Sequence, residues 1–346
     1  MLEIDGSKKS GSGTILRLAV SLASILGEEL HIYNIRKRRS KPGLRPQHLE
    51  ALLTAARLCG ADVEGAALNS TEVWFRPGKI VGGTVEAEIG TAGSIPMLLL
   101  TVLPMCAFAK ETVELHVTKG GTDVRHSPTI NYMRFVLLPM LERMGLRSSL
   151  KVHRFGYYPR GMGEVTLRVQ PCRRLSPIWL EEAGRAGKVR GVSVCTFLKG
   201  RRVAERQATA ARKYLEGRGV EVDIDVLYDS SNPLQRGSSI VLWTETDKGA
   251  LLGADAIGEV RKPSEDVGKE AAEALFEELR SGATVDLHLA DMLVPYMALA
   301  EGGSVYLARS MTEHLDTNVW LAEEILGAKF EVRKARGLYR VEKRGK

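Results

Sequence analysis

Apolar and polar residues along the chain follow strand and helix periods in an order that repeats. Residues 2–5 alternate like a strand, residues 6–13 form a glycine-rich loop, and residues 14–25 carry apolar side chains at helical spacing. The pattern continues with a strand at residues 30–35, a basic loop at 36–46, a helix at 47–58, and strands near 72–75 and 84–89. This order predicts a β-α-β-α-β-β unit.

The same order of elements returns twice, which predicts an internal repeat. The second copy begins with the strand at residues 84–89 and continues through a loop at 90–94, a helix at 95–107, a strand at 112–117, a loop at 118–128, a helix at 129–144, and strands near 149–153 and 164–169. The third copy comprises a strand at residues 284–287, a helix at 290–300, a strand at 304–308, a helix near 313–326, and strands near 329–332 and 339–342.

Residues 188–280 separate the second copy from the third and have a pattern of their own. They predict a strand at residues 189–197, a helix at 203–216, strands near 220–226, 239–244 and 250–253, and a helix at 263–279. We therefore expect an α/β fold of the α+β type, with a three-repeat domain at residues 1–186 and 281–346 and a smaller inserted α/β domain at 187–280. One repeat alone buries little apolar surface, so the three should pack around a shared helical interior, with a site where their loops converge.

The composition narrows the class of protein. With 346 residues, 44% hydrophobic and 26% charged, the chain can bury a full core, which excludes disorder for most of its length. A net charge of +7 suits a polyanionic partner, although ordinary basic enzymes share it. The four cysteines form no C-x-x-C pair, so we expect neither a zinc site nor a disulfide framework. Asparagine and glutamine are scarce, which predicts a hot-growing source.

No segment indicates a membrane protein. The longest apolar stretch, near residues 95–109, contains two prolines and is shorter than the roughly 20 residues that a spanning helix needs. The N-terminus enters a strand pattern at once and has no basic run followed by an apolar one, so a signal peptide is not expected. We therefore predict a cytoplasmic location.

Two loops of the first repeat could bind phosphate. The glycine-rich loop at residues 6–13 lies between a strand and a helix, but it lacks the lysine of a Walker loop, and a tight turn explains it equally well. The basic loop has six cations in the ten positions from Arg36 to Arg45, stiffened by prolines and a glycine. A charge run is usually a solvated face, but like charges held together repel one another, and a bound anion would relieve this.

His314 is the candidate nucleophile. Ser310 and Glu313 match a capping box, which places His314 in the first turn of a helix, where the dipole favours a neutral imidazole and binds phosphate. A neutral imidazole beside a phosphate can attack it. A lone histidine in a first turn is more often a surface or capping residue, and the other histidines show no spacing for a metal site.

Several short motifs occur in an order that resembles one known family. They are Ile4-Asp5-Gly6 with Ile15-Leu16-Arg17, Lys41-Pro42-Gly43-Leu44 with Gln47-His48-Leu49, Gly90-Thr91-Ala92-Gly93-Ser94 with Thr101-Val102-Leu103-Pro104, Gly120-Gly121-Thr122-Asp123, Gly156-Tyr157-Tyr158-Pro159, Leu289-Ala290-Asp291, and His314 with Thr317-Asn318. Together they resemble RNA 3'-terminal phosphate cyclase over nearly the whole chain.

This resemblance implies a fold of three β-α-β-α-β-β units like the C-terminal domain of translation initiation factor three, with an inserted α/β domain. It implies an ATP-dependent ligase reaction on an RNA with a 3'-phosphate end. A histidine matching His314 takes AMP from ATP, AMP passes to the RNA 3'-phosphate, and the 2'-hydroxyl displaces it to leave a 2',3'-cyclic phosphate. A divalent metal, Mg or Mn, is implied, with unknown ligands. The oligomeric state is left open.

The resemblance also implies residue roles. His288, Leu289, Ala290 and Asp291 would border the nucleotide, and Arg17, Arg36, Arg39, Gln47 and His48 would bind phosphates or RNA. The chain departs from the family at Ser10, where a glutamate thought to hold the metal is usual, at Leu100 and Met292, where glutamines are usual, and at His288, where a tyrosine is usual.

Two other functions compete with the cyclase. Ser10 and Leu100 favour a non-catalytic RNA-binding relative that acts in RNA or ribosome maturation, whereas retention of His314 favours the enzyme. An enolpyruvyl transferase also uses similar repeats with basic phosphate-binding loops, but the motif order and His314 argue against it.

Overall fold

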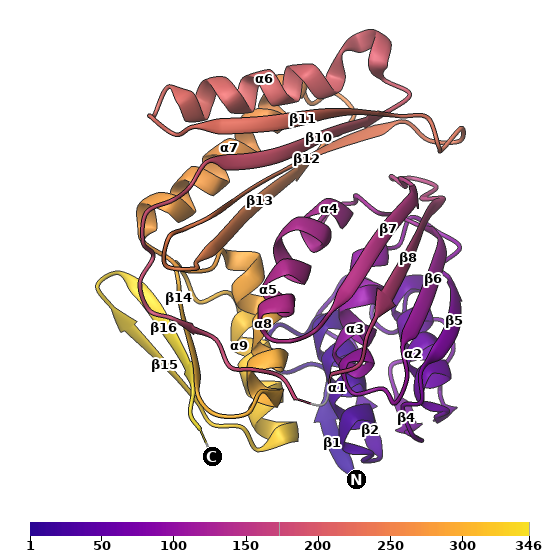
Figure 1. Ribbon diagram of the computed structural model, residues 1–346. Coiled ribbons are helices and arrows are strands. Elements are labelled where there is room, and N and C mark those ends of the chain that lie inside the picture. The colour runs from indigo at the N-terminus through magenta and orange to yellow at the C-terminus, as the bar shows by residue number, and fades with distance from the viewer. Residues whose placement is uncertain (173, 346) are drawn as a thin grey trace.

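The first unit forms a four-stranded sheet with two helices in the computed structural model, which describes residues 1–172 and 174–345 (Figure 1). Its strands β1 (Leu2–Asp5), β2 (Leu30–Tyr33), β3 (Asp62–Glu64) and β4 (Val73–Arg76) pair in the order β1-β2-β4-β3. Its helices are α1 (Gly13–Leu26) and α2 (Pro46–Cys59). The prediction missed β3 and was wrong to count residues 84–89 in this unit, because that strand pairs only within the second sheet.

The second unit repeats this topology. Its strands β5 (Gly83–Glu88), β6 (Val113–Gly120), β7 (Ser148–Arg154) and β8 (Gly163–Val169) pair in the order β5-β6-β8-β7. Its first helix is α3 (Ile95–Ala107). The helix predicted at residues 129–144 consists of α4 (Ile130–Tyr132), a π-helical turn η1 (Met133–Leu137) and α5 (Leu138–Arg143), which has Pro139 near its start. Pro139 donates no backbone N–H, which accounts for the irregular turn before it.

The third unit is interrupted by the insertion. Its strands β9 (Trp179–Leu180), β14 (Ser304–Ala308), β15 (Phe330–Ala335) and β16 (Leu338–Lys343) pair in the order β15-β16-β14-β9, with helices α8 (Leu287–Leu299) and α9 (Glu313–Leu326). The strand predicted at residues 284–287 is wrong. Asp286 instead caps α8, its side chain accepting from the N–H groups of His288 and Leu289, and Val285 makes only an isolated bridge to Leu251. The first strand of this unit is β9, before the insertion.

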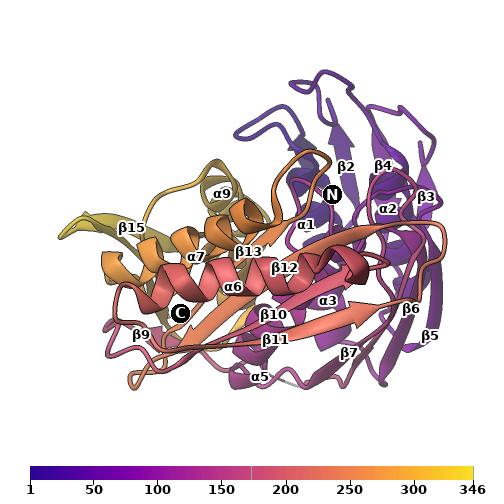
Figure 2. The same cartoon turned by 90° about the horizontal axis from the view of Figure 1, so that it is seen from above.

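The insertion lies across one end of the molecule (Figures 1 and 2). Its strands β10 (Val189–Thr196), β11 (Val222–Asp229), β12 (Gly237–Glu245) and β13 (Leu251–Ile257) pair in the order β11-β10-β12-β13, and α6 (Val203–Glu216) and α7 (Ser264–Ser281) cover one face. A short 3-10 turn, η2 (Lys199–Arg201), precedes α6. This region has a hydrophobic core of its own. The predicted domain boundaries themselves stay a prediction.

The helices of the three units share one interior, with the sheets toward the outside (Figure 1). Helix α1 packs against α2, α3 and α9, and α8 packs against α9. The α3 sequence is apolar on nearly every side, as expected for a helix that lies between others rather than at the surface. The predicted α/β class is confirmed. None of the described helices is both long and apolar enough to cross a membrane.

Candidate functional site around His314

The N-termini of α1 and α9 meet where the first and third units pack together. Ser12 caps α1 and accepts from the N–H of Thr14, and Thr312 caps α9 and accepts from the N–H of Leu315 at 2.9 Å. The predicted capping box of Ser310 and Glu313 is wrong, because Thr312 is the cap. His314 is nevertheless the second residue of α9, within its first turn as expected. Two positive helix ends therefore point into one region.

His314 faces the first helix of the first unit. Its Nδ1 lies 3.3 Å from Thr14 Oγ1, and that hydroxyl oxygen accepts from Arg17 Nη2 at 3.1 Å. Desolvation by the surrounding loops lowers the pKa of His314, and the nearby Arg17 and Arg39 lower it further, against an opposing effect of Glu313. The imidazole is therefore neutral near pH 7, which leaves one ring nitrogen with a free electron pair.

The glycine-rich loop is attached to α9 by several contacts. The backbone N–H of Ser10 donates to Thr317 Oγ1 at 3.2 Å, and the Ser10 hydroxyl lies 2.9 Å from that of Ser12. Lys9 Nζ forms an ion pair with Asp316 at 2.9 Å. The contacts with Thr317 and Asp316 join residues more than 300 positions apart in the sequence and hold α9 against the glycine-rich loop.

His48 fixes the second helix of the first unit against the first. Its Nδ1 accepts from the Arg45 N–H at 3.4 Å, and a Cβ added to Gly13 would lie only 2.2 Å from its Nε2. Burial lowers the pKa of His48 to about 2, with Arg17 and the basic loop adding to the effect. A neutral, buried His48 thus packs on the start of α1, and only glycine fits at position 13.

Apart from Lys9, which pairs with Asp316, most cations near His314 have no carboxylate partner among the described residues. Among residues 1–172 and 174–345, seven cations at this junction form no ion pair; they are Arg17, Arg36, Lys37, Arg38, Arg39, Lys41 and Arg45. Desolvation lowers the pKa of Arg17 to about 10, and desolvation with Arg45 and Arg39 lowers that of Arg36. Mutually repelling cations in a desolvated setting favour a bound anion.

Hydrogen bonds to backbone carbonyls hold the basic loop in place. Arg36 Nη1 donates to the carbonyls of Lys41 and Gly43 at 2.8 and 2.7 Å. Arg38 Nη1 donates to the carbonyl of Lys9 at 2.5 Å, which ties this loop to the glycine-rich loop. Arg39 is exposed and makes no such contact in the described part of the chain, so it is the arginine of this loop most available to a ligand.

The residues predicted to border the nucleotide divide into two groups. His288 is exposed at the start of α8 and contributes to lowering the pKa of His314. Asp291 accepts from Thr312 Oγ1 at 2.5 Å, and desolvation raises its pKa to about 6. Leu289 and Ala290, at 0% and 1% exposure, are buried, so their side chains offer no surface to a ligand.

Gln47 contacts the second unit. Its Oε1 accepts from the Ser94 N–H at 2.8 Å, immediately before α3. Gln47 was predicted to bind phosphate. In this structure it joins the first unit to the second, next to His48 at the start of α2.

Sequence reasoning missed Thr14, Thr312 and Arg45 as parts of this cluster. Arg45 lies within the basic loop, and Thr312, two residues before His314, could have been tested as a cap. The contact of Thr14 with His314 has no local signal, because it depends on how the first and third units pack.

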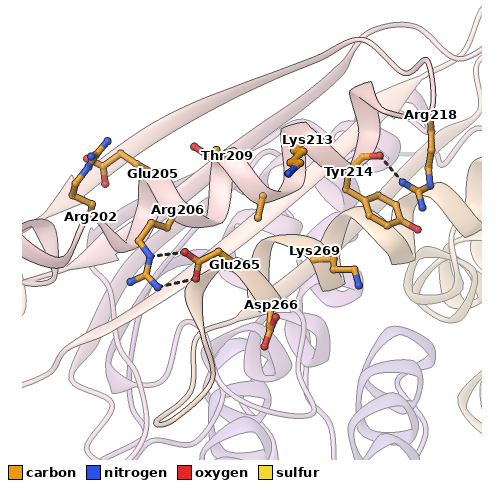
Figure 3. Close-up of a pocket in the computed structure, with 11 residues that line it drawn as sticks. Arg202, Glu205, Arg206, Thr209, Lys213, Tyr214, Arg218, Glu265, Asp266 and Lys269 are labelled. Atoms are coloured by element: carbon orange, nitrogen blue, oxygen red, sulfur yellow. Dashed lines mark hydrogen bonds and ion pairs between the residues drawn. The ribbon is translucent and has the colours of Figure 1, made fainter.

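A groove between α6 and α7 is the alternative site, with a volume of about 650 Å³ (Figure 3). Arg206 forms a bidentate ion pair with Glu265, with both N···O distances at 2.7 Å. The Arg218 guanidinium lies 3.5 Å from the centre of the Tyr214 ring. Its charged groups are of both signs, and neither histidine nor cysteine lines it. The candidate chemistry therefore lies around His314 rather than in this groove.

The comparisons with known proteins agree in one family. The family model described as RNA 3'-terminal phosphate cyclase matches residues 8–332. A relative of that name from Methanopyrus kandleri is 44% identical over 341 residues, which cover 97% of this chain and 96% of the relative. A second, from Methanosarcina barkeri, is 45% identical over 341 residues and covers 99% of both chains. A third, from Pyrococcus furiosus, is 44% identical over 333 residues, 96% of this chain and 95% of the relative.

Proposed function

Because the chain belongs to the RNA 3'-terminal phosphate cyclase family, we propose that it converts the 3'-terminal phosphate of an RNA to a 2',3'-cyclic phosphate with ATP as co-substrate. The observation that carries this proposal is His314, which is neutral and lies in the first turn of α9 among cations without carboxylate partners. An enzyme that transfers AMP needs such a nucleophile beside such charges.

In the first step, a ring nitrogen of His314 attacks the α-phosphorus of ATP. The N–P bond forms, the bond to the bridging oxygen breaks, and pyrophosphate leaves with that electron pair. Because Nδ1 faces Thr14 Oγ1, we assign the ring proton to Nδ1 and the attacking electron pair to Nε2. Arg17 and Arg39 supply positive charge where the phosphate charge increases.

In the next steps, AMP moves to the RNA. An oxygen of the 3'-terminal phosphate attacks the phosphorus of the AMP, and the N–P bond breaks with its electron pair returning to His314. The vicinal 2'-hydroxyl then attacks the 3'-phosphorus, AMP departs, and the hydroxyl proton passes to water. A rigid loop of unpaired cations supports this proposal, because three phosphate groups must approach one another.

The family resemblance implies a divalent metal, but the described residues do not form a complete set of protein ligands for one. Within the described residues, no group of three or more His, Cys, Asp or Glu side chains is placed to hold a metal ion. The Ser10 hydroxyl forms a hydrogen bond with the Ser12 hydroxyl, at the position where the family usually has a glutamate. Magnesium is commonly held by nucleotide phosphates and water with few protein ligands, and no step above depends on it.

The test is covalent labelling of the protein with ATP that carries a label on its α-phosphorus. We expect an acid-labile, base-stable bond in the wild type and no label in His314→Ala, a loss of about 10⁴-fold or more. His153→Ala, at an exposed histidine on β7, is the matched control and should label normally. Equal labelling of the His314→Ala variant would overturn the proposal.

A second candidate is an RNA-binding protein without catalysis, favoured by Ser10, which stands where the family usually has a glutamate. It predicts affinity for RNA without preference for the 3'-end. Competition between oligonucleotides with 3'-phosphate and 3'-hydroxyl ends separates the two functions, because only the cyclase should prefer the phosphate.

A further inference from the structure

Tyr158 is an aromatic residue that the fold leaves in solvent. Tyr158 is 79% exposed, whereas the neighbouring Tyr157 is 4% exposed. Both lie in the loop between β7 and β8, at the upper end of these strands in Figure 1. A single exposed aromatic ring needs no explanation by itself. Whether Tyr158 can bind a ligand depends on how firmly its loop is held.

The loop under Tyr158 is anchored on both sides. The Tyr157 hydroxyl lies 3.0 Å from Thr196 Oγ1 of the inserted sheet, and the Gly161 N–H donates to the Tyr157 carbonyl at 2.7 Å. Asn232 Nδ2 donates to the carbonyls of Phe155 and Gly161 at 2.7 and 3.1 Å. The backbone that carries Tyr158 is therefore fixed, so little conformational freedom is lost when a ligand packs on the ring.

A series of contacts connects this loop to His314. A Cβ added to Gly161 would lie 2.7 Å from the Thr91 carbonyl, which places the loop against the segment before α3. That segment receives Gln47, and the adjacent His48 packs on α1 at Gly13. Thr14 of α1 then contacts His314. Contacts therefore link the loop that carries Tyr158 to His314 through the segment before α3 and the starts of α2 and α1.

Cations accompany the ring. Arg160 and Arg236 are exposed and form no ion pair within the described residues, and Gly237, next to Arg236, packs on the Tyr157 ring. Single-stranded RNA is bound by aromatic rings on which bases stack, with cations along the backbone.

We propose that Tyr158 is a stacking subsite for a base of the RNA substrate, several nucleotides upstream of the 3'-phosphate bound at His314. This inference rests on the proposed function. Base stacking on an aromatic side chain typically changes affinity by about ten- to hundredfold. The subsite should therefore act only on RNA long enough to reach it, and it should not affect the transfer of AMP to His314.

The experiment measures affinity and cyclisation for 3'-phosphorylated oligonucleotides of increasing length, from about two to about twelve nucleotides. In the wild type, affinity should rise at the length that reaches Tyr158. Tyr158→Ala should remove that rise, with a KM about tenfold or more higher for long RNA, and leave short RNA unchanged. Tyr158→Phe keeps the ring and should behave as the wild type, whereas Tyr158→Leu keeps apolar surface without a ring and should behave as the alanine variant.

A fluorescent base analogue, 2-aminopurine, placed at successive positions should be quenched at one position in the wild type and not in Tyr158→Ala. Equal affinity of the wild type and Tyr158→Ala at every length, or wild-type behaviour of Tyr158→Leu, would overturn the subsite. Labelling with ATP separates this from the proposed function. Label in all variants with no length effect rejects the subsite alone, and no label even in the wild type rejects the cyclase.

Discussion

Two junctions in this molecule bring polar side chains together from distant parts of the chain, and they do so in opposite ways. At the junction of α1, α2 and α9, Lys9 pairs with Asp316, but Arg17 and Arg39 near His314 have no carboxylate partner among the described residues. At the junction between the second unit and the inserted sheet, Asp123 is 2% exposed and accepts from Thr122 Oγ1, while Tyr157 contacts Thr196. The first junction is open to solvent and has an excess of cations, whereas the second is buried.

The difference supports the proposal that the first junction binds a ligand and the second holds the fold together. Like charges at close range destabilise a folded protein unless an anion separates them. A buried carboxyl such as Asp123 instead avoids its charge, because desolvation raises its pKa to about 7. Unpaired cations around a neutral histidine therefore favour a site for phosphates, whereas a buried carboxyl with a raised pKa favours a structural role.

The largest change at the open junction should follow from Arg17→Gln. Removal of this cation should slow the labelling of His314 by about 10²-fold, because a desolvated positive charge near the reacting phosphate is lost. Arg17 also lowers the pKa of His314, so its removal should raise that pKa toward 6.5. Since only the neutral ring attacks, the acidic limb of the pH-rate profile should move to higher pH.

The measurement is the single-turnover rate of labelling at saturating ATP across acidic and neutral pH. Arg57→Gln is the control, because Arg57 lies on α2 but pairs with Glu50. An Arg17→Gln profile with its limb at the wild-type pH would mean that Arg17 does not act on His314.

Thr14→Val sharpens the comparison by removing one contact while keeping the shape of the side chain. Without an oxygen 3.3 Å from Nδ1, the ring proton is no longer held at that nitrogen, and labelling should slow by about tenfold. Thr14→Ser restores the hydroxyl and should restore the rate. Nitrogen NMR of the His314 ring should report a protonated Nδ1 in the wild type and a mixture of tautomers in Thr14→Val; unchanged spectra would reject the positioning role.

The elements of the fold were largely predictable, because each depends on local periodicity. Helices α6 and α9 begin and end at the predicted residues. The errors concern short strands and the sheets in which strands pair. Strand β9 has two residues and is separated from its helix by the insertion, and strand β3 has three residues. No period can be read in so few residues, and the strand predicted at residues 284–287 was placed by analogy with the other repeats.

The site was predictable only in part. Residue type and helix position indicated His314 and the basic loop, and the structure brings Arg17, Arg39 and His48 to the same junction. Local sequence could not indicate which cations face a ligand. Arg36 was predicted to bind phosphate, yet its guanidinium is bonded to the loop's own carbonyls, whereas Arg39 is exposed.

This distinction within the basic loop predicts different salt dependences. Arg39→Gln should lower the slope of log affinity for RNA against log salt by about 0.7, the loss of one contact with a single-stranded phosphate backbone. Arg36→Gln should weaken binding by releasing the loop, with loss of its Lys41 and Gly43 contacts. Titration of RNA at several salt concentrations tests both. If Arg39→Gln keeps the wild-type slope, Arg39 belongs to a solvated face.

The smallest effect on chemistry should come from the closed junction, at Asp123→Asn. Labelling of His314 should be unchanged, because Asp123 is not part of that site. The effect should appear in stability. The pKa of Asp123 is raised from 3.8 to about 7 in the folded protein, so the folded state binds a proton that the unfolded state releases between these values. The free energy of unfolding therefore falls as pH rises through this window, by at most about 1.4 kcal/mol per pH unit.

Asparagine carries no proton to release and resembles the protonated acid in shape, so Asp123→Asn should flatten this dependence between about pH 4 and about pH 7. Chemical denaturation of the wild type and variant at a series of pH values gives the two slopes. Parallel slopes would mean that Asp123 ionises in the folded protein with an ordinary pKa, and the junction would then hold a charge. In that case the two junctions would differ in the sign of their charge rather than in whether they are open, and the contrast that assigns the ligand to His314 would be weaker.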